Sequence, residues 1–200
     1  MSVCVVTGYV PLPCEHRTRE RYNELGARLL ECCNRSIVFR QELGDCWLSR
    51  KIGNVELGGK DSTAYHCVQH EKFSWLERAS TVMDATTLIW IDYGVFHMPG
   101  VTKEIVCDFI RRVEEAEPDV IVSPSGGAGD PFGNNPTWLF LGAVFVVPAT
   151  LTGWLSEKCR EHLDPLSWEV NTLARVQQKH PESFRLYAAD HNHSIFDNYK

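Results

Sequence analysis

Asp92 stands at the end of a short apolar run, Leu88 to Ile91, and is followed by Tyr93 and Gly94. The run is bulky, partly β-branched and uninterrupted, which predicts a central strand buried on both faces. Ligands of open α/β sheets bind beyond the carboxyl ends of the strands, so a carboxylate placed there can hold a metal ion or a ribose. Asp and Gly are also ordinary turn residues, and this stretch alone leaves a turn equally open.

The end of the chain gathers further residues that could do chemistry. His191 and His193 lie in a stretch of eight residues that begins with Asp190 and ends with Asp197. Two histidines and two aspartates in so short a stretch are more than a terminal tail needs. Upstream, Glu169 falls in the first turn of an expected helix, where the helix dipole stabilises a carboxylate whether or not it does chemistry.

Cations and an aromatic residue indicate an anionic, nucleotide-like partner. Arg17, Arg19 and Arg21 crowd the start of an expected helix, 18–33, where cations oppose the helix dipole. They hint at phosphate, although a solvated basic face is the commoner explanation. Tyr9, just past the first expected strand, could stack on a base or could line the rim of the core.

Strand and helix patterns alternate along the chain. Expected strands are 3–7, 36–39, 88–91, 120–122 and 138–148, and expected helices are 18–33, 62–79, 102–117, 151–162 and one that opens at 168. This alternation predicts an α/β fold with a largely parallel sheet. Gly142 and Ala143, inside the last strand, mark a close approach to the backbone. The glycine-rich loop 123–137 has the length of a lid or binding loop.

Composition is that of one globular domain spanning residues 1–200, with 44% hydrophobic and 23% charged residues. The net charge of −6 lacks the basic excess of most nucleic-acid-binding proteins but allows a local basic groove. No apolar segment is long enough to cross a bilayer, and the first expected strand shows no charged leader or cleavage pattern before it, so we expect an unexported protein. Eight scattered cysteines without a Cys-x-x-Cys pair favour reduced thiols. We therefore expect a cytoplasmic protein.

The order of several short motifs resembles that of small glycosyltransferases of the GT-A type, most closely the HtrL/YibB-like proteins, over nearly the whole chain. The motifs are Lys72 on a helix before the sheet, Trp90-Ile91-Asp92-Tyr93-Gly94, His97, the segment Trp138 to Phe145 with Leu141-Gly142-Ala143, Trp168-Glu169-Val170-Asn171, and a histidine-containing ending before Asn198-Tyr199. The resemblance implies a GT-A-like, Rossmann-like mixed sheet that is largely parallel and flanked by helices.

The resemblance also implies a cofactor and a donor. GT-A enzymes use Mn²⁺ or Mg²⁺ to bridge the diphosphate of a nucleotide sugar, here most simply a UDP-sugar. An Asp-x-Asp strand end holds the metal, often with a C-terminal histidine. Trp90 takes the first position of that motif and Asp92 matches the second, which leaves ribose recognition unassigned. His191 and His193 both fall where the terminal ligand would lie, and the choice between them stays open.

Roles for the other residues follow from the same resemblance. Glu169 would be a general base if the enzyme inverts, or a nucleophile or stabilising carboxylate if it retains. The sugar and acceptor pocket would include His97, Gly142, Ala143 and Trp168. Donor binding would involve Thr7, Tyr9, Arg19, Lys72, Trp90 and Tyr93.

The acceptor is open: a glycan or lipid precursor, a small molecule, or a hydroxymethylated DNA base of the phage type. A metallohydrolase using Asp92 and the His191/His193 cluster is an alternative, but it leaves Lys72, Gly142 and Glu169 unexplained. A non-catalytic domain that binds a sugar nucleotide is a second alternative, and it would make Glu169 dispensable. The sequence does not indicate an oligomeric state.

Overall fold

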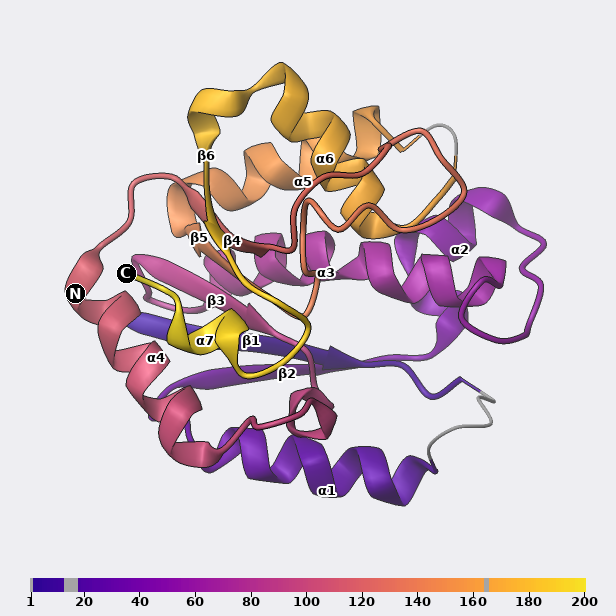
Figure 1. The fold of residues 1–200 in the computed structure, drawn as a ribbon. Helices are drawn as coiled ribbons and strands as arrows, with labels where there is room; N and C mark the ends of the chain where they lie inside the picture. The colour runs from indigo at the N-terminus through magenta and orange to yellow at the C-terminus, as the bar shows by residue number, and fades with distance from the viewer. Residues whose placement is uncertain (1, 13–17, 164–165) are drawn as a thin grey trace.

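A computed structural model describes residues 2–12, 18–163 and 166–200. Its centre is one six-stranded sheet of order β2-β1-β3-β5-β4-β6 (Figure 1). The strands are β1 (Val3–Tyr9), β2 (Ser36–Arg40), β3 (Thr87–Ile91), β4 (Ile121–Ser125), β5 (Val144–Pro148) and β6 (Phe184–Ala188). β5 runs antiparallel to β3 and β4, whereas the pairs β1·β2, β1·β3 and β4·β6 are parallel. The expected mixed, largely parallel sheet is confirmed.

Helices cover both faces of the sheet (Figure 1). One layer contains α1 (Arg19–Leu30), α4 (Lys103–Ala116) and the short α7 (Ser194–Asp197); the other contains α2 (Trp47–Ile52), α3 (Thr63–Val82), α5 (Thr152–Glu161) and α6 (Glu169–Lys179). Thr102 caps α4, since its hydroxyl accepts a hydrogen bond from the N–H of Ile105. The fold is therefore a three-layer α/β/α arrangement.

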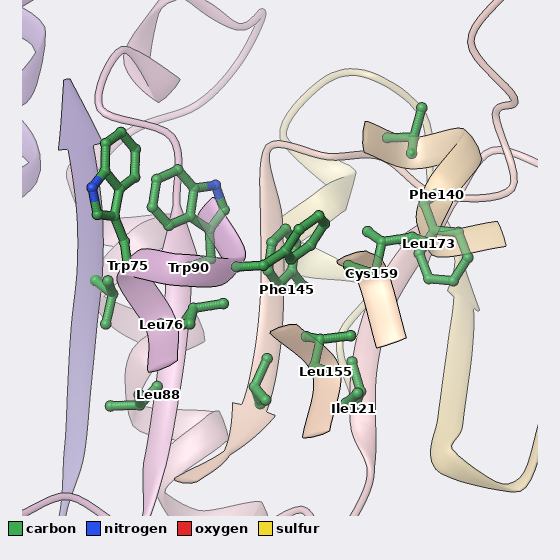
Figure 2. Close-up of a cluster of buried hydrophobic side chains, with 14 of the residues drawn as sticks. Trp75, Leu76, Leu88, Trp90, Ile121, Phe140, Phe145, Leu155, Cys159 and Leu173 are labelled. Atoms are coloured by element: carbon green, nitrogen blue, oxygen red, sulfur yellow. The ribbon is translucent and has the colours of Figure 1, made fainter. Parts of the chain in front are cut away.

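The central strand β3 contributes side chains to the hydrophobic cores on both faces of the sheet. Leu88 and Trp90 pack toward α3, and the alternate residues Ile89 and Ile91 pack toward α1 and α4. Trp90 stacks between Trp75 and Phe145, with ring centroids 5.7 and 6.2 Å away (Figure 2). Every residue of β3 is buried, as the sequence predicts. This packing gives Asp92 a rigid support.

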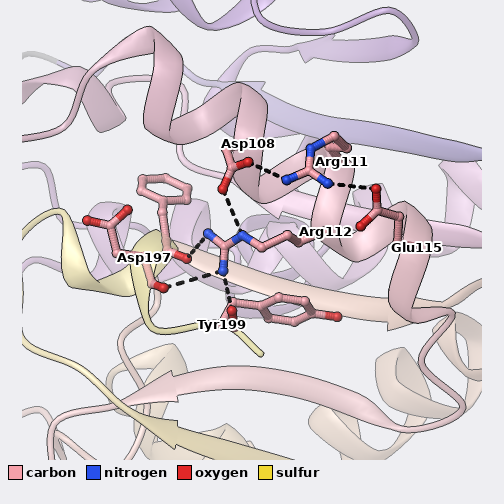
Figure 3. A network of polar contacts seen from close by, with 7 residues as sticks. Asp108, Arg111, Arg112, Glu115, Asp197 and Tyr199 are labelled. Atoms are coloured by element: carbon pink, nitrogen blue, oxygen red, sulfur yellow. Dashed lines mark hydrogen bonds and ion pairs between the residues drawn. The ribbon is translucent and has the colours of Figure 1, made fainter.

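The C-terminal segment folds back on α4. The Arg112 guanidinium donates to the backbone carbonyls of Phe196, Asp197 and Tyr199, and its Nε donates to Asp108 at 2.9 Å (Figure 3). A charged donor makes comparatively strong hydrogen bonds with such carbonyls. Arg112 thus fixes the segment that carries His191.

Two parts of the fold differ from the sequence-based expectation. The strand expected at 138–148 begins only at Val144, because hydrogen bonds from the N–H of Gly126 to Trp138 and from the N–H of Leu141 to Pro124 fold residues 138–143 against the end of β4. Strand β6 and helix α2 were not predicted. β6 is a half-buried edge strand without clear alternation, and α2 has only six residues.

The loop 123–137 is docked on α6 and does not stand open. The Asn171 amide accepts a hydrogen bond from the N–H of Thr137 at 2.6 Å and donates to the carbonyls of Gly133 and Asn135. Arg175, also buried, donates to the carbonyl of Pro131 at 2.8 Å. These contacts with α6 anchor the loop, which the sequence predicted as a lid or a binding loop.

The cysteines of the described ranges are all free thiols, and Cys14 lies outside those ranges. No helix in the described part of the chain is both long and apolar enough to cross a membrane.

Candidate active site

A cavity of about 500 Å³ opens at the carboxyl ends of the parallel strands β1 and β3. This is the edge at which open α/β sheets bind their ligands. Its lining residues from the expected site are Tyr9, Arg19, Lys72, Trp90, Asp92, Tyr93, His97 and His191. The structure therefore brings together residues from β1, α1, α3, the end of β3 and the C-terminal segment.

Three tyrosines form one wall of this cavity. Tyr9 stacks on Tyr93 with ring centroids 5.5 Å apart and lies equally close to Tyr22. Arg40 donates a hydrogen bond to the Tyr93 hydroxyl at 2.9 Å. A side chain at Gly26 would lie 2.0 Å from the Tyr93 ring, so this glycine lets helix α1 approach. The wall offers flat aromatic faces on which a base could stack.

Lys72 joins two carboxylates at the floor of the cavity. Its ammonium donates to Glu169 Oε1 at 3.0 Å and to the Gly142 carbonyl at 2.9 Å, and it lies 3.1 Å from Asp92 Oδ1. A lysine ammonium has three N–H donors, and each has a partner here. Lys72 therefore positions Asp92 and Glu169, and its three N–H donors are occupied by protein groups.

The charges of this cluster stabilise one another. Burial lowers the pKa of Lys72, but Asp92 and Glu169 outweigh it and hold that pKa above its ordinary value. Burial raises the pKa of Glu169, but Lys72 outweighs it, so that pKa lies below its ordinary value. Lys72 and Glu169 are therefore both charged at neutral pH. The Asp92 side chain is 34% exposed and the Glu169 side chain 5%, and of the two only Asp92 lines the cavity among the described residues.

Gly142 and Ala143 support this cluster from behind. A Cβ at Gly142 would lie 2.4 Å from Glu169 Oε1, so the missing side chain makes room for that carboxylate. The buried Ala143 accepts a hydrogen bond from the Asp92 N–H at 2.9 Å through its carbonyl. The sequence analysis placed both residues in the sugar and acceptor pocket. The structure places them under Asp92 and Glu169, outside the cavity lining of the described chain.

His191 and His193 have different surroundings. His191 lines the cavity, and its ring centroid lies 6.5 Å from that of His97 and 6.3 Å from that of Trp138. Burial lowers the pKa of His191 although Asp92 opposes the shift, so the ring is neutral at neutral pH. His193 is half exposed, and its Nδ1 lies 2.8 Å from Asp197 Oδ2. Of the two histidines, the structure brings His191 to Asp92.

Two other expected residues lie away from the cavity. Thr7 is fully buried inside β1, two residues before the strand ends, because its side chain points into the sheet's core. Trp168 caps α6 and packs edge-on against Tyr65 and His66, with centroid distances of 5.6 and 5.5 Å. Trp168 thus supports Tyr65, which does line the cavity.

The sequence analysis missed several lining residues, among them Tyr22, Lys60, Tyr65 and Trp75. Tyr22 follows Arg19 by three residues on α1, a helical spacing that would have pointed to it. Lys60 lies in an irregular glycine-rich stretch, where sequence offers no signal for its direction.

The residues present do not fit a divalent ion held by the protein. Asp92 Oδ1 already accepts the indole N–H of Trp90 at 2.8 Å and faces the ammonium of Lys72. His193 turns to Asp197. Within the described ranges, no three His, Cys, Asp or Glu residues are grouped so that they could hold a metal ion. Mg²⁺ and Mn²⁺ prefer several oxygen ligands, and this donor set supplies one carboxylate and one imidazole.

The solved structures that share the fold include a glycosyltransferase and a synthetase. A glycosyltransferase involved in glycosylating the major capsid protein of PBCV-1 matches with a TM-score of 0.57 and 10% identity, over 93% of this chain and 81% of that one. A CMP-2-keto-3-deoxy-manno-octonic acid synthetase, solved with CTP, matches with a TM-score of 0.51 and 6% identity, over 94% and 90% of the two chains. No family model and no curated protein matches the sequence. At these identities the likeness establishes the fold, a GT-A or Rossmann-like mixed sheet.

Proposed function

We propose that this chain is a glycosyltransferase that moves a sugar from a nucleotide-sugar donor to an acceptor hydroxyl. The observation that carries this proposal is the composition of the cavity at the ends of β1 and β3. It combines a tyrosine wall, two exposed cations and the Asp92 carboxylate, at the edge where this fold binds ligands. The sequence resemblance to HtrL/YibB-like proteins and the fold shared with a glycosyltransferase support it.

The donor would occupy the cavity from the tyrosine wall to Asp92. The base stacks on Tyr9 and Tyr93, and the diphosphate meets Arg19 and Lys60. The sugar then lies toward Asp92 and His191. A UDP-sugar is the donor class to test first.

The transfer breaks the bond between the anomeric carbon and a diphosphate oxygen and joins that carbon to the acceptor oxygen. The acceptor proton goes to a base, and the leaving diphosphate keeps the electron pair. His191 is neutral and lies beside Asp92, which suits it to take that proton. Glu169, the sequence-based candidate for this role, lies behind Lys72, so we propose that it positions Lys72 and, through it, Asp92.

The acceptor classes that we propose are a glycan or lipid precursor, a small hydroxylated molecule, and a hydroxymethylated base in DNA. Trp138 is 51% exposed beside His191 and offers a face for stacking a sugar or a base. This contact favours an acceptor with a ring over a linear alcohol.

A screen of nucleotide sugars tests the proposal, with release of the nucleoside diphosphate as the readout. We expect slow hydrolysis of one donor without an acceptor. Asp92→Asn should lower the rate about 100-fold or more, because it removes the charge that faces the reacting sugar. His191→Ala should also lower the rate strongly, whereas the matched variant His193→Ala should stay near the wild-type rate. Full activity of a folded Asp92→Asn protein, or no turnover of any donor, contradicts the proposal.

The likeness to the CMP-sugar synthetase favours nucleotidyl transfer as a second candidate. That reaction consumes a nucleoside triphosphate and releases pyrophosphate, so the same screen with CTP and a pyrophosphate readout separates the two. A non-catalytic binding domain would bind a nucleoside diphosphate and turn over neither class of substrate.

A further inference from the structure

We infer that the cavity binds the diphosphate of its nucleotide ligand without a divalent metal ion, and that Arg19 and Lys60 supply the positive charge in the metal's place. This inference rests on the proposed function, because it takes the ligand to be a nucleotide sugar. It departs from the Mn²⁺ or Mg²⁺ dependence that the sequence resemblance implies.

The first support is that core packing fixes the Trp90 indole N–H, which donates a hydrogen bond to Asp92. Trp90, whose indole N–H donates to Asp92 Oδ1, is 1% exposed and stacks between Trp75 and Phe145. The indole cannot turn away without disrupting the core. A metal ion at this oxygen would compete with a buried hydrogen bond and with the Lys72 ammonium for the same atom.

The second support is the cation already present beside Asp92. Lys72 is held by Gly142 and Glu169 as well as by Asp92, so its ammonium cannot withdraw when another cation arrives. Unit charges about 4 Å apart interact by about 4 kcal/mol at a partly buried site, and the second charge of a divalent ion doubles that repulsion. Asp92 is therefore a poor metal ligand in this setting.

The third support is the presence of two exposed cations at the cavity. Arg19 and Lys60 both line it with exposed side chains. The ion pairs found among residues 2–12, 18–163 and 166–200 include neither of them. The whole chain carries a net charge of −6, so two cations at one cavity are a local departure from its acidic character. Each phosphate of the donor carries a negative charge, and these two exposed cations match that charge.

The same two cations would serve the reaction. Negative charge grows on the diphosphate as the sugar departs, and fixed positive groups that face it lower the barrier. Arg19 can donate two parallel N–H bonds to one phosphate, and Lys60 can act as a point charge on the other. Binding should therefore weaken with added salt, because these are exposed charges.

Calorimetric titration of the purified chain with UDP, CDP, GDP and ADP tests the inference. One series uses protein stripped with EDTA in chelator-treated buffer, and the other adds excess Mn²⁺. We expect at least one nucleotide to bind in EDTA, with Mn²⁺ changing its Kd by less than about 3-fold. Arg19→Ala and Lys60→Ala should each weaken binding about 10-fold or more in EDTA. The matched controls Arg21→Ala and Lys51→Ala remove exposed cations that do not line the cavity and should bind as the wild type does.

The outcomes separate the inference from the proposed function. Binding that requires Mn²⁺ overturns the inference and leaves the glycosyltransferase proposal intact. Binding in EDTA that survives both Arg19→Ala and Lys60→Ala overturns the assignment of these cations. If no nucleoside diphosphate binds under either condition, the inference fails together with the function on which it rests.

Discussion

At the scale of single residues, Lys72 decides the geometry of the site. A buried charge is costly unless it is paired, and Lys72 meets this requirement by holding two carboxylates and one carbonyl. Lys72 lies on α3, and its three partners come from the end of β3, the turn before β5 and the start of α6. A single ammonium therefore joins elements that lie far apart in the sequence.

Gly142→Ala should disrupt this arrangement although it adds only a methyl group. The new Cβ would lie 2.4 Å from Glu169 Oε1 and 3.0 Å from Val170 Cγ1, so the carboxylate must move away from Lys72. We expect a loss of about 1–3 kcal/mol in the free energy of unfolding and a large loss of activity. Urea denaturation and the donor-hydrolysis assay measure the two effects.

Gly153→Ala is the matched control for this prediction. Gly153 lies in helix α5, and a Cβ there would meet nothing within 4 Å. Alanine favours a helix over glycine, so this variant should be unchanged or stabilised by about 0.5–1 kcal/mol. Equal stability and activity of Gly142→Ala and wild type would show that the carboxylate is not held as described.

More than half of the residues that the sequence singled out line the cavity, and the others lie elsewhere in the fold. Asp92, Tyr9 and Arg19 line the cavity as expected, because the end of a buried strand and the start of a helix are visible in the sequence. Gly142 was expected to make room for a ligand and makes room for Glu169 instead. A glycine shows that something approaches the backbone, but only the fold shows what approaches.

At the scale of elements, the C-terminal segment depends on α4. Arg112 is the contact, since it donates to three carbonyls of the segment that follows His191 (Figure 3). Arg112→Ala should leave those carbonyls without a charged donor and cost about 2 kcal/mol in the free energy of unfolding. We expect faster hydrogen exchange at residues 195–199 and lower activity, because His191 loses its support.

Arg111→Ala provides the control within the same helix. Arg111 pairs with Asp108 and Glu115 of α4 itself, and these side chains are exposed. Exposed pairs of this kind add little to stability, so exchange in the C-terminal segment should not change. Similar hydrogen exchange in the Arg111 and Arg112 variants would show that Arg112 does not hold the C-terminal segment on α4.

Elements with strong patterns were predictable and weakly patterned ones were not. α4 has a capping Thr102 and an apolar stripe, and β3 is a continuous apolar run, so both follow from local sequence. β6 became a strand because it pairs with β4 across the sheet, although its residues are only half buried. Residues 138–143 are apolar but form turns, since tertiary hydrogen bonds outweigh their strand propensity.

At the scale of the whole molecule, charge is unevenly distributed. The chain is acidic, yet Arg19 and Lys60 meet at one cavity from positions forty-one residues apart. Net charge alone argued against a polyanionic partner and did not reveal this site. Long-range proximity of this kind depends on the order of the strands, which a single sequence does not specify.

Acid should destabilise the whole fold through His70, which lies in the interface between α3 and α6. Burial lowers its pKa from 6.5 to about 4, although a hydrogen bond to the His66 carbonyl opposes the shift. That carbonyl can only accept, so Nδ1 carries the proton, and Nε2 accepts from the Thr172 hydroxyl, whose oxygen in turn accepts from Arg175. A second proton on His70 would break this chain of hydrogen bonds.

Between pH 6.5 and about 4 the unfolded chain binds a proton at His70 that the folded chain does not, so the free energy of unfolding falls as the pH falls. Between pH 6.5 and 5 this one residue should cost about 2 kcal/mol, from about 1.4 kcal/mol per pH unit. Urea denaturation from pH 7 to pH 5 measures the slope. His70→Gln should be less stable at pH 7 yet lose less stability on acidification. If His70→Gln and the wild type lose stability equally between pH 7 and pH 5, His70 is not the group that makes this interface acid-sensitive.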